Sequence, residues 1–180
     1  MKRCLIVVDF QNDFVTGSLG FPEAEKLIPA IIQKIESCRT SGDVVLFTFD
    51  THETSYLDTQ EGTLLPVEHC IRGTDGHRLH PEIEKLRQPD DLCFKKTTFG
   101  SAELMDYLRA HRFESIELCG LVSNICVLSN AVLAKTAQPE TPILIDVRCT
   151  AGADPALHKA ALQVMQGLQM QLIGIEEDTE

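Results

Sequence analysis

Short apolar runs recur along the chain at a spacing that suits the buried strands of a sheet. Each run has five or six residues, which is too short for a buried helix and typical of a strand covered on both faces. The sequence therefore predicts five buried strands. The runs are CLIVV (4–8), VVLFTF (44–49), SIELC (115–119), PILIDV (142–147) and MQLIGI (170–175).

Between these runs, apolar residues recur at the three-to-four-residue spacing of amphipathic helices. Ser101 is a candidate N-cap for one helix, and Asp154 with Pro155 in the first turn begins another. Because strands and helices alternate, we expect an α/β fold of three layers, α/β/α, with a mostly parallel central sheet. The predicted helices cover residues 24–39, 101–112, 124–137 and 154–168.

Residues 51–93 depart from this alternation, since they are polar, contain several histidines and are interrupted by Gly and Pro. A loop of this length within a compact domain is usually functional. We expect a short helix near residues 81–86 and a functional role for the rest. No repeat, low-complexity tract or linker marks a boundary, so residues 1–180 are predicted to form one domain.

Charge and cysteine content narrow the class of protein. Acidic side chains outnumber basic ones by 27 to 16, and the net charge of −11 argues against nucleic acid or an anionic membrane as the main partner. The N-terminus lacks the cleavage site of a signal peptide, and no apolar segment is long enough to span a bilayer. The seven cysteines show no C-x-x-C pairing. We therefore expect a cytoplasmic protein with free thiols.

Reactive side chains follow three of the predicted strands. Asp9 and Asp50 come directly after two of them, and the third leads through a turn at residues 120–123 to Cys126. Because ligands bind beyond the carboxyl ends of the strands in an open parallel sheet, these side chains should share one edge. Cys126 has two interpretations: a small buried core residue, the usual place of a free cysteine, or a nucleophile whose thiol pKa is lowered at the start of a helix.

A cysteine nucleophile needs a proton acceptor and a nearby cation. Asp9 could accept the proton, because a carboxylate in a partly dry pocket has a raised pKa. Lys95 and Lys96 precede the predicted helix at residues 101–112 and could supply the positive charge, although such lysines are usually solvated. These residues alone leave both interpretations of Cys126 open.

Five segments resemble, in order, the motifs of the cysteine hydrolase superfamily that contains nicotinamidases and isochorismatases. The resemblance covers the chain from Asp9 to about Leu168 and implies the isochorismatase-like hydrolase fold. It also implies a triad of Asp9, Lys96 and Cys126. The segments are VVDFQNDF, FDTH, KKTTF, GLVSNICV and DVRCTAGADPALHKAAL.

In the mechanism that this resemblance implies, Asp9 takes the thiol proton and Cys126 attacks an amide carbonyl, while Lys96 stabilises the ionised pair. Water then hydrolyses the thioester. Family members often have a cis peptide bond four residues before the cysteine, which corresponds here to the bond between Leu121 and Val122. The N–H groups of Val122 and Cys126 are then the expected oxyanion donors.

Asp50 and His52 stand two residues apart at a strand end, so an extended backbone projects both side chains to one side. Such a pair is common in loops but can also begin a metal site with His69. The resemblance to nicotinamidases implies a divalent metal, zinc first with manganese or iron as alternatives, that binds the pyridine nitrogen of the substrate. Many nicotinamidases have a histidine where this chain has Tyr56, and Glu61 is the predicted replacement. The predicted metal ligands are therefore Asp50, His52, Glu61 and His69.

Phe14 and Phe99 resemble the aromatic walls of the substrate pocket in relatives, although both would also suit the core. The leading hypothesis is hydrolysis of nicotinamide to nicotinate and ammonia, in NAD salvage. One alternative is another hydrolase of the superfamily: a different amidase, a ureido or carbamoyl hydrolase, or an isochorismatase. A second is a non-catalytic member that binds a small molecule. The expected partner is a small-molecule amide, and many relatives are homo-oligomers.

Overall fold

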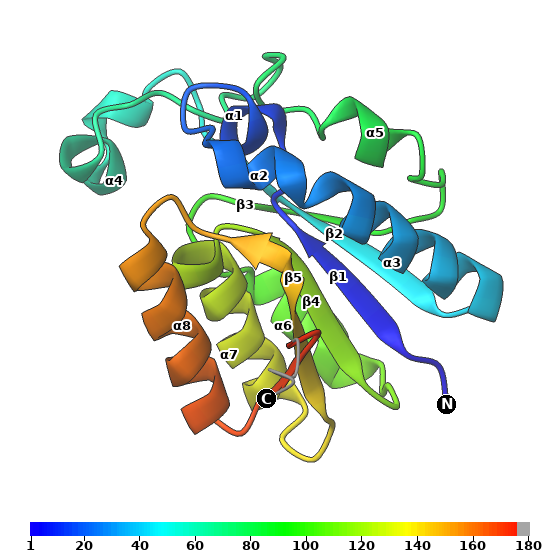
Figure 1. Cartoon of the computed structure of the whole chain (residues 1–180). Helices are drawn as coiled ribbons and strands as arrows, with labels where there is room; N and C mark the ends of the chain where they lie inside the picture. The colour runs from blue at the N-terminus through cyan, green and yellow to red at the C-terminus, as the bar shows by residue number, and fades with distance from the viewer. Residues whose placement is uncertain (176–180) are drawn as a thin grey trace.

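A six-stranded sheet forms the centre of the computed structural model, which describes residues 1–175 (Figure 1). The strands are hydrogen-bonded in the order β3-β2-β1-β4-β5-β6, and every neighbouring pair is parallel. This arrangement confirms the predicted parallel sheet. The strands are β1 (Cys4–Val8), β2 (Val44–Asp50), β3 (Cys93–Lys96), β4 (Ile116–Leu121), β5 (Ile143–Ala151) and β6 (Gln171–Ile173).

The strand β1 lies inside the sheet and is buried along its whole length. Ile6 and Val8 belong to the apolar cluster on one face of the sheet. Leu5 and Val7 belong to the cluster on the other face. Because alternate side chains of a strand point to opposite faces, a strand covered on both sides is apolar at every position. This explains why CLIVV is a continuous apolar run.

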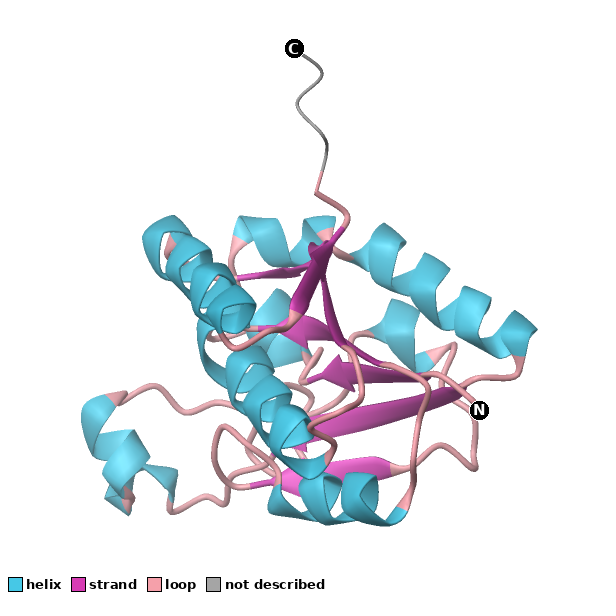
Figure 2. Cartoon of the chain, turned by 90° about the horizontal axis from the view of Figure 1, so that it is seen from below, coloured by secondary structure: helices cyan, strands magenta, loops and turns pink. Residues whose placement is uncertain are grey.

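Helices cover both faces of the sheet, which confirms the predicted three layers (Figure 1, Figure 2). Among residues 1–175, no helix combines the length and apolar character needed to cross a membrane. One layer contains α1 (Asn12–Val15), α2 (Pro22–Lys26), α3 (Ile28–Ser41) and α5 (Pro81–Glu84). The other contains α6 (Ala102–Ala110), α7 (Leu128–Ala137) and α8 (Pro155–Gly167).

The prediction of one helix over residues 24–39 is wrong, because the chain forms α2 and α3 there with a break at Leu27. Pro29 lies in the first turn of α3, where its missing N–H costs no hydrogen bond. In a continuous helix the same proline would remove a hydrogen bond. The predicted helices at residues 101–112 and 154–168 correspond to α6 and α8.

The edge strand β3 was not predicted from the sequence. It pairs with β2, and its side chains alternate, with Phe94 and Lys96 buried and Cys93 and Lys95 exposed. Four residues with two positive charges resemble a solvated loop more than a strand. The strand matters for the site because it carries Lys96 to the carboxyl end of the sheet.

The connection from β2 to β3 leaves the body of the protein at that same end. It contains η1 (Tyr56–Asp58) and α4 (Gln60–Leu64) before α5, which falls within the predicted range of 81–86. Figure 1 and Figure 2 both show α4 projecting away from the sheet. We refer to residues 51–69 as the excursion.

Candidate active site

The candidate site lies where the chain changes direction across the sheet. From β1 the sheet continues through β2 and β3 on one side and through β4, β5 and β6 on the other. In open α/β sheets the crevice at such a switch point is the usual place for a ligand. Asp9 directly follows β1, and Cys126 follows β4 after a short turn. The two residues therefore flank the switch point.

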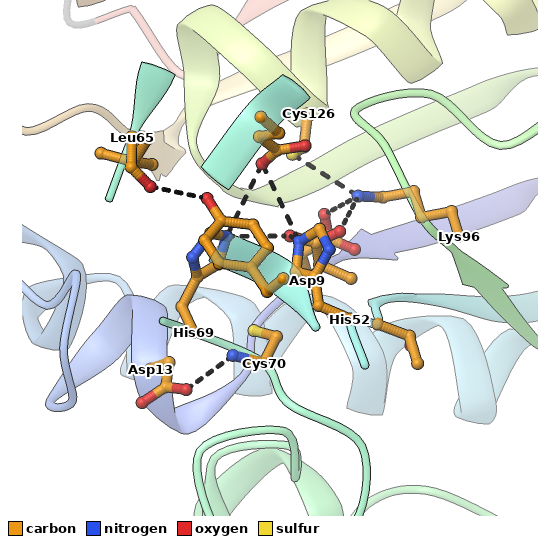
Figure 3. Close-up of polar contacts among 12 residues, drawn as sticks. Asp9, Asp13, His52, Leu65, His69, Cys70, Lys96 and Cys126 are labelled. Carbon is orange, nitrogen blue, oxygen red and sulfur yellow. Dashed lines mark hydrogen bonds and ion pairs between the residues drawn. The ribbon is translucent and has the colours of Figure 1, made fainter. Parts of the chain in front are cut away.

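Asp9, Lys96 and Cys126 form a continuous set of contacts (Figure 3). Lys96 Nζ lies 2.6 Å from Asp9 Oδ2 and 3.6 Å from Cys126 Sγ. Asp9 is 0% exposed, and Lys96 and Cys126 are each 4% exposed. Buried charges need close partners of opposite sign, and the ammonium group also lies 3.4 Å from Asp50 Oδ1. This places an acid, a cation and a thiol together, which is what nucleophilic attack by a cysteine requires.

Thr48, on the neighbouring strand β2, holds Asp9 in place. Asp9 has a left-handed backbone with φ of +44°, which Asp adopts more readily than most residues. Its N–H lies 3.3 Å from the Thr48 carbonyl oxygen and 3.2 Å from the Thr48 hydroxyl. The same hydroxyl donates to Asp9 Oδ1 at 2.7 Å. Thr48 therefore fixes one carboxylate oxygen and leaves the other for Lys96.

Cys126 lies in a turn of π-helix, η2 (Ser123–Val127), that leads into α7. The predicted α-helical start is therefore wrong, and π-turns of this kind are frequent at functional sites. The peptide bond before Val122 is cis, as the family resemblance implied. Gly120 has φ of +109°, and a Cβ there would lie 2.0 Å from the Val8 carbonyl oxygen. Only glycine allows β4 to approach β1 this closely before the turn.

Asn130 connects the cysteine turn with the loop that follows β3. Its side-chain nitrogen donates to the carbonyl oxygens of Cys126 at 2.8 Å and of Phe99 at 3.1 Å. Its side-chain oxygen accepts from the Ser101 N–H at 3.0 Å, and the whole residue is buried. Sequence reasoning did not identify Asn130. The available signal is an asparagine inside an apolar helix, a position that it disfavours unless its amide is used.

Gln11, like Asn130, is hydrogen-bonded through its side chain to backbone groups, here at the end of β2. The sequence analysis did not identify it either. Its side-chain oxygen accepts from the Asp50 N–H at 2.8 Å, and its nitrogen donates to the Asp50 carbonyl oxygen at 2.9 Å. The nitrogen also donates to the His77 carbonyl oxygen at 2.8 Å. Gln11 therefore holds the backbone of Asp50 beside the end of β1. The signal in the sequence was its place within VVDFQNDF.

Burial shifts the proton affinities of the three central groups. It raises the pKa of Asp9, and the charge of Lys96 offsets only part of this. Burial lowers the pKa of Lys96, but the nearby Asp9, Cys126 and Asp50 outweigh it, so that the pKa is raised overall. Burial also raises the pKa of the Cys126 thiol, so the predicted lowering is wrong because desolvation dominates. The thiol therefore needs a neighbouring proton acceptor, and Asp9 with its raised pKa is suited to that role.

Four potential metal ligands gather beside these groups, and their donor atoms all lie within 4.8 Å of one another. Asp50 Oδ2 lies 3.1 Å from His52 Nε2 and 3.4 Å from His69 Nε2. His69 Nδ1 lies 2.8 Å from the Val67 carbonyl oxygen, which can only accept, so Nδ1 donates and Nε2 is the nitrogen that faces Asp50 and Glu61. Two imidazoles and two carboxylates suit zinc and also the alternatives, manganese and iron. The donor set, completed by Glu61, fits the predicted divalent metal.

Tyr56 supports this group without supplying a ligand. Its ring centroid lies 4.7 Å from that of His52 and 5.0 Å from that of His69. Its hydroxyl donates to the Leu65 carbonyl oxygen at 2.9 Å. Glu61 reaches the histidines from α4, with its carboxylate 3.8 Å from each imidazole. The excursion thus brings in the fourth donor that the sequence predicted in place of a histidine.

A pocket of about 240 Å³ is lined by Cys126 and by three of the four potential metal ligands. Its volume lies below the range of about 300–1,000 Å³ typical for drug-sized ligands, so it suits a small molecule. Phe14 and Phe99, the predicted aromatic walls, both line it, and the Phe14 ring packs edge-on against His69 at 5.6 Å. Val122 and Cys126, the predicted oxyanion donors, line the same pocket.

Known proteins are similar to this chain over most of its length. A family model described as the isochorismatase domain matches residues 3–177. The uncharacterized isochorismatase family protein PncA of Bacillus subtilis is 33% identical over 143 residues, which cover 73% of this chain and 78% of the relative. The nicotinamidase/pyrazinamidase of Mycobacterium tuberculosis is 27% identical over 187 residues, covering 95% of this chain and 98% of the relative.

A comparison of folds agrees with the comparison of sequences. The crystal structure of nicotinamidase/pyrazinamidase PncA from Bacillus subtilis matches this chain with a TM-score of 0.84 and 29% identity, covering 96% of this chain and 99% of that one. The agreement in family model, sequence and fold means that this chain belongs to the isochorismatase family of hydrolases.

Proposed function

We propose that the protein hydrolyses a small primary amide through a thioester on Cys126, with nicotinamide as the leading substrate and nicotinate and ammonia as products. The observation that carries this proposal is the contact of Lys96 with both Asp9 and Cys126 beside a small pocket. Relatives named as nicotinamidases or pyrazinamidases at 25–27% identity support the choice of amide.

The proposed reaction begins with proton transfer. Asp9 accepts the proton of the Cys126 thiol, and Lys96, in contact with both, stabilises the resulting thiolate. The sulfur attacks the amide carbon, and the N–H groups of Val122 and Cys126 stabilise the oxyanion. The carbon–nitrogen bond breaks as Asp9 returns the proton to the departing ammonia. Water then attacks the thioester, which releases the acid and restores the thiol.

The metal ligands in this proposal are Asp50, His52, Glu61 and His69. When bound, the ion would act as a Lewis acid that holds and orients the ring nitrogen of a pyridine or pyrazine amide. The contact of Lys96 with Asp50 at 3.4 Å links these residues to the reacting groups. Phe14 and Phe99 would pack against the ring and exclude water from the pocket.

The test is ammonia release from nicotinamide and pyrazinamide, measured with and without a chelator and alongside the metal content of the protein. We expect activity in the wild type and a loss of about a thousand-fold or more in Cys126→Ala. Cys93→Ala is the matched control, because Cys93 is a free and exposed cysteine. Full activity in Cys126→Ala would contradict the mechanism. An inactive wild type with bound metal would favour the non-catalytic alternative.

A further inference from the structure

A second and larger depression lies beside the proposed catalytic pocket. It is a groove of about 640 Å³ between the excursion and the loop that follows β3. One side is formed by residues 51–65 and the other by residues 97–99 with Ile125. Asp9, Lys96 and Cys126 do not line this groove, which is more than twice as large as the pocket that contains Cys126.

The groove and the pocket share part of their walls. Glu61, Leu65, Phe99 and Ile125 line both. A ligand whose reacting group lies at Cys126 would therefore reach the groove along these four shared residues. The two spaces together fall within the size range of sites for larger ligands, whereas the pocket alone does not.

The walls of the groove expose apolar side chains. Leu64 is 78% exposed, Phe99 43%, Leu65 38% and Ile125 37%. Apolar side chains gathered at one place on a surface usually mark a binding site, because their contact with water is unfavourable. Three of these four residues, Leu65, Phe99 and Ile125, also line the proposed catalytic pocket, which favours an apolar occupant next to it.

The charges of the groove exclude one class of occupant. Glu53 and Glu61 are among its lining residues, and no lysine or arginine is. The Glu53 carboxylate pairs with Arg72, which lies outside the lining. A carboxylate or phosphate in the groove would therefore find no lysine or arginine there, and the charge of a divalent ion held at Asp50 and Glu61 would be balanced by these two carboxylates. The remaining polar lining is mostly uncharged, including Thr51, Thr59 and Thr97.

We propose that this groove is a second substrate subsite, which binds an uncharged apolar substituent on the ring of the amide substrate. This inference rests on the proposed function and names its substrate class: primary amides of small aromatic rings that carry an alkyl or aryl group. A second copy of the chain seated in the groove would cover the four residues that also line the pocket of Cys126. A substituent on the substrate fills the groove without that conflict.

The first experiment compares kcat/KM for nicotinamides that carry a butyl group at each ring carbon in turn. We expect the best of these to exceed nicotinamide by about five-fold, as burial of a short alkyl chain predicts. A carboxypropyl group at the same position should bring kcat/KM below that of nicotinamide. A lower value for every butyl compound than for nicotinamide would overturn the subsite, whereas no hydrolysis of any amide would overturn the proposed function and the subsite with it.

The second experiment uses Leu64→Ser, since Leu64 lines the groove but not the catalytic pocket. The ratio of kcat/KM for the best butyl compound to that for nicotinamide should fall about three-fold. Val164→Ser is the matched control, an aliphatic side chain 50% exposed on α8 that should leave the ratio unchanged. A Leu64→Ser protein with an unchanged ratio but a smaller assembly in sedimentation would show an interface between copies and overturn the proposal.

Discussion

The two halves of the site are built in different ways. Asp9, Lys96 and Cys126 are buried at or just beyond the ends of parallel strands, and Thr48 and Asn130 fix their positions. Glu61 and most of the groove residues instead belong to the excursion, which projects from the sheet (Figure 1), while residues 97–99 and Ile125 complete the groove. Chemistry requires positions fixed to a fraction of an ångström, whereas recognition tolerates a more open surface. In the proposed function, the residues at the strand ends therefore carry out the reaction, and the excursion contributes to the choice of substrate.

The largest effect is expected from Asp9→Asn, which keeps the shape of the side chain but removes the proton acceptor. Amide hydrolysis should fall about a thousand-fold or more, because the buried thiol then has no base. Stopped assays of ammonia release and alkylation of Cys126 by iodoacetamide are the measurements. If Asp9→Asn retained both rates, proton transfer would not depend on Asp9.

The second prediction concerns the excursion. Glu61→Ala removes one of the four donors and should weaken zinc affinity about a hundred-fold, measured by competition with a chromophoric chelator. Asp58→Ala is the control, an exposed carboxylate in the same excursion that lies outside the donor set. Equal zinc affinity in the two variants would mean that Glu61 is not a metal ligand.

The third prediction concerns Asn130, which we interpret as a positioning residue for Cys126. Asn130→Asp replaces a donor of two hydrogen bonds with an acceptor facing two carbonyl oxygens. We expect kcat to fall about ten-fold with KM nearly unchanged, because the sulfur is displaced while the pocket remains. Thr136→Ala, an exposed position on the same helix, is the control. A change confined to KM would contradict a positioning role.

The smallest effect concerns buried charge in the sheet away from the site. Burial alone raises the pKa of Asp146, but hydrogen bonds from Arg148 and Lys34 outweigh it and hold the pKa at about 2. A depressed pKa stabilises the fold above the unfolded-state pKa of about 4, and this stabilisation is lost as pH falls towards 2. The expected loss is about 2 kcal/mol in the free energy of unfolding. Asp146→Asn should abolish this pH dependence in urea unfolding, and an unchanged slope would show that another group causes it.

The sequence predicted those elements whose residue pattern follows from a general physical rule. CLIVV is apolar because both of its faces are covered, and Asp9 and Asp50 stand at strand ends where an open sheet binds ligands. The strand β3 was missed because an edge strand of four residues can carry charges. Its alternation, with Lys96 buried and Lys95 exposed, is visible only after the pairing with β2 is known.

Other features depended on long-range contacts that no local pattern encodes. Asn130 donates to the Phe99 carbonyl oxygen and Gln11 to that of Asp50, and folding alone brings these residues close to their partners. The lowered thiol pKa was predicted from the helix start alone, whereas burial among Asp9 and other acids determines its direction. The groove was also not predicted, since Leu64 and Phe99 lie 35 positions apart in the sequence. Sequence patterns located the reactive groups, but folding determined their surroundings.

The central claim is that Cys126 forms a thioester with the amide substrate. Mixing the protein with excess nicotinamide, stopping with acid within the first turnovers and digesting the chain for mass spectrometry tests it most directly. We predict a nicotinoyl group on the peptide that contains Cys126, and none on the peptide that contains the exposed Cys93. Release of ammonia and nicotinate by an enzyme whose Cys126 never carries the acyl group, under conditions that preserve a model thioester, would contradict the account.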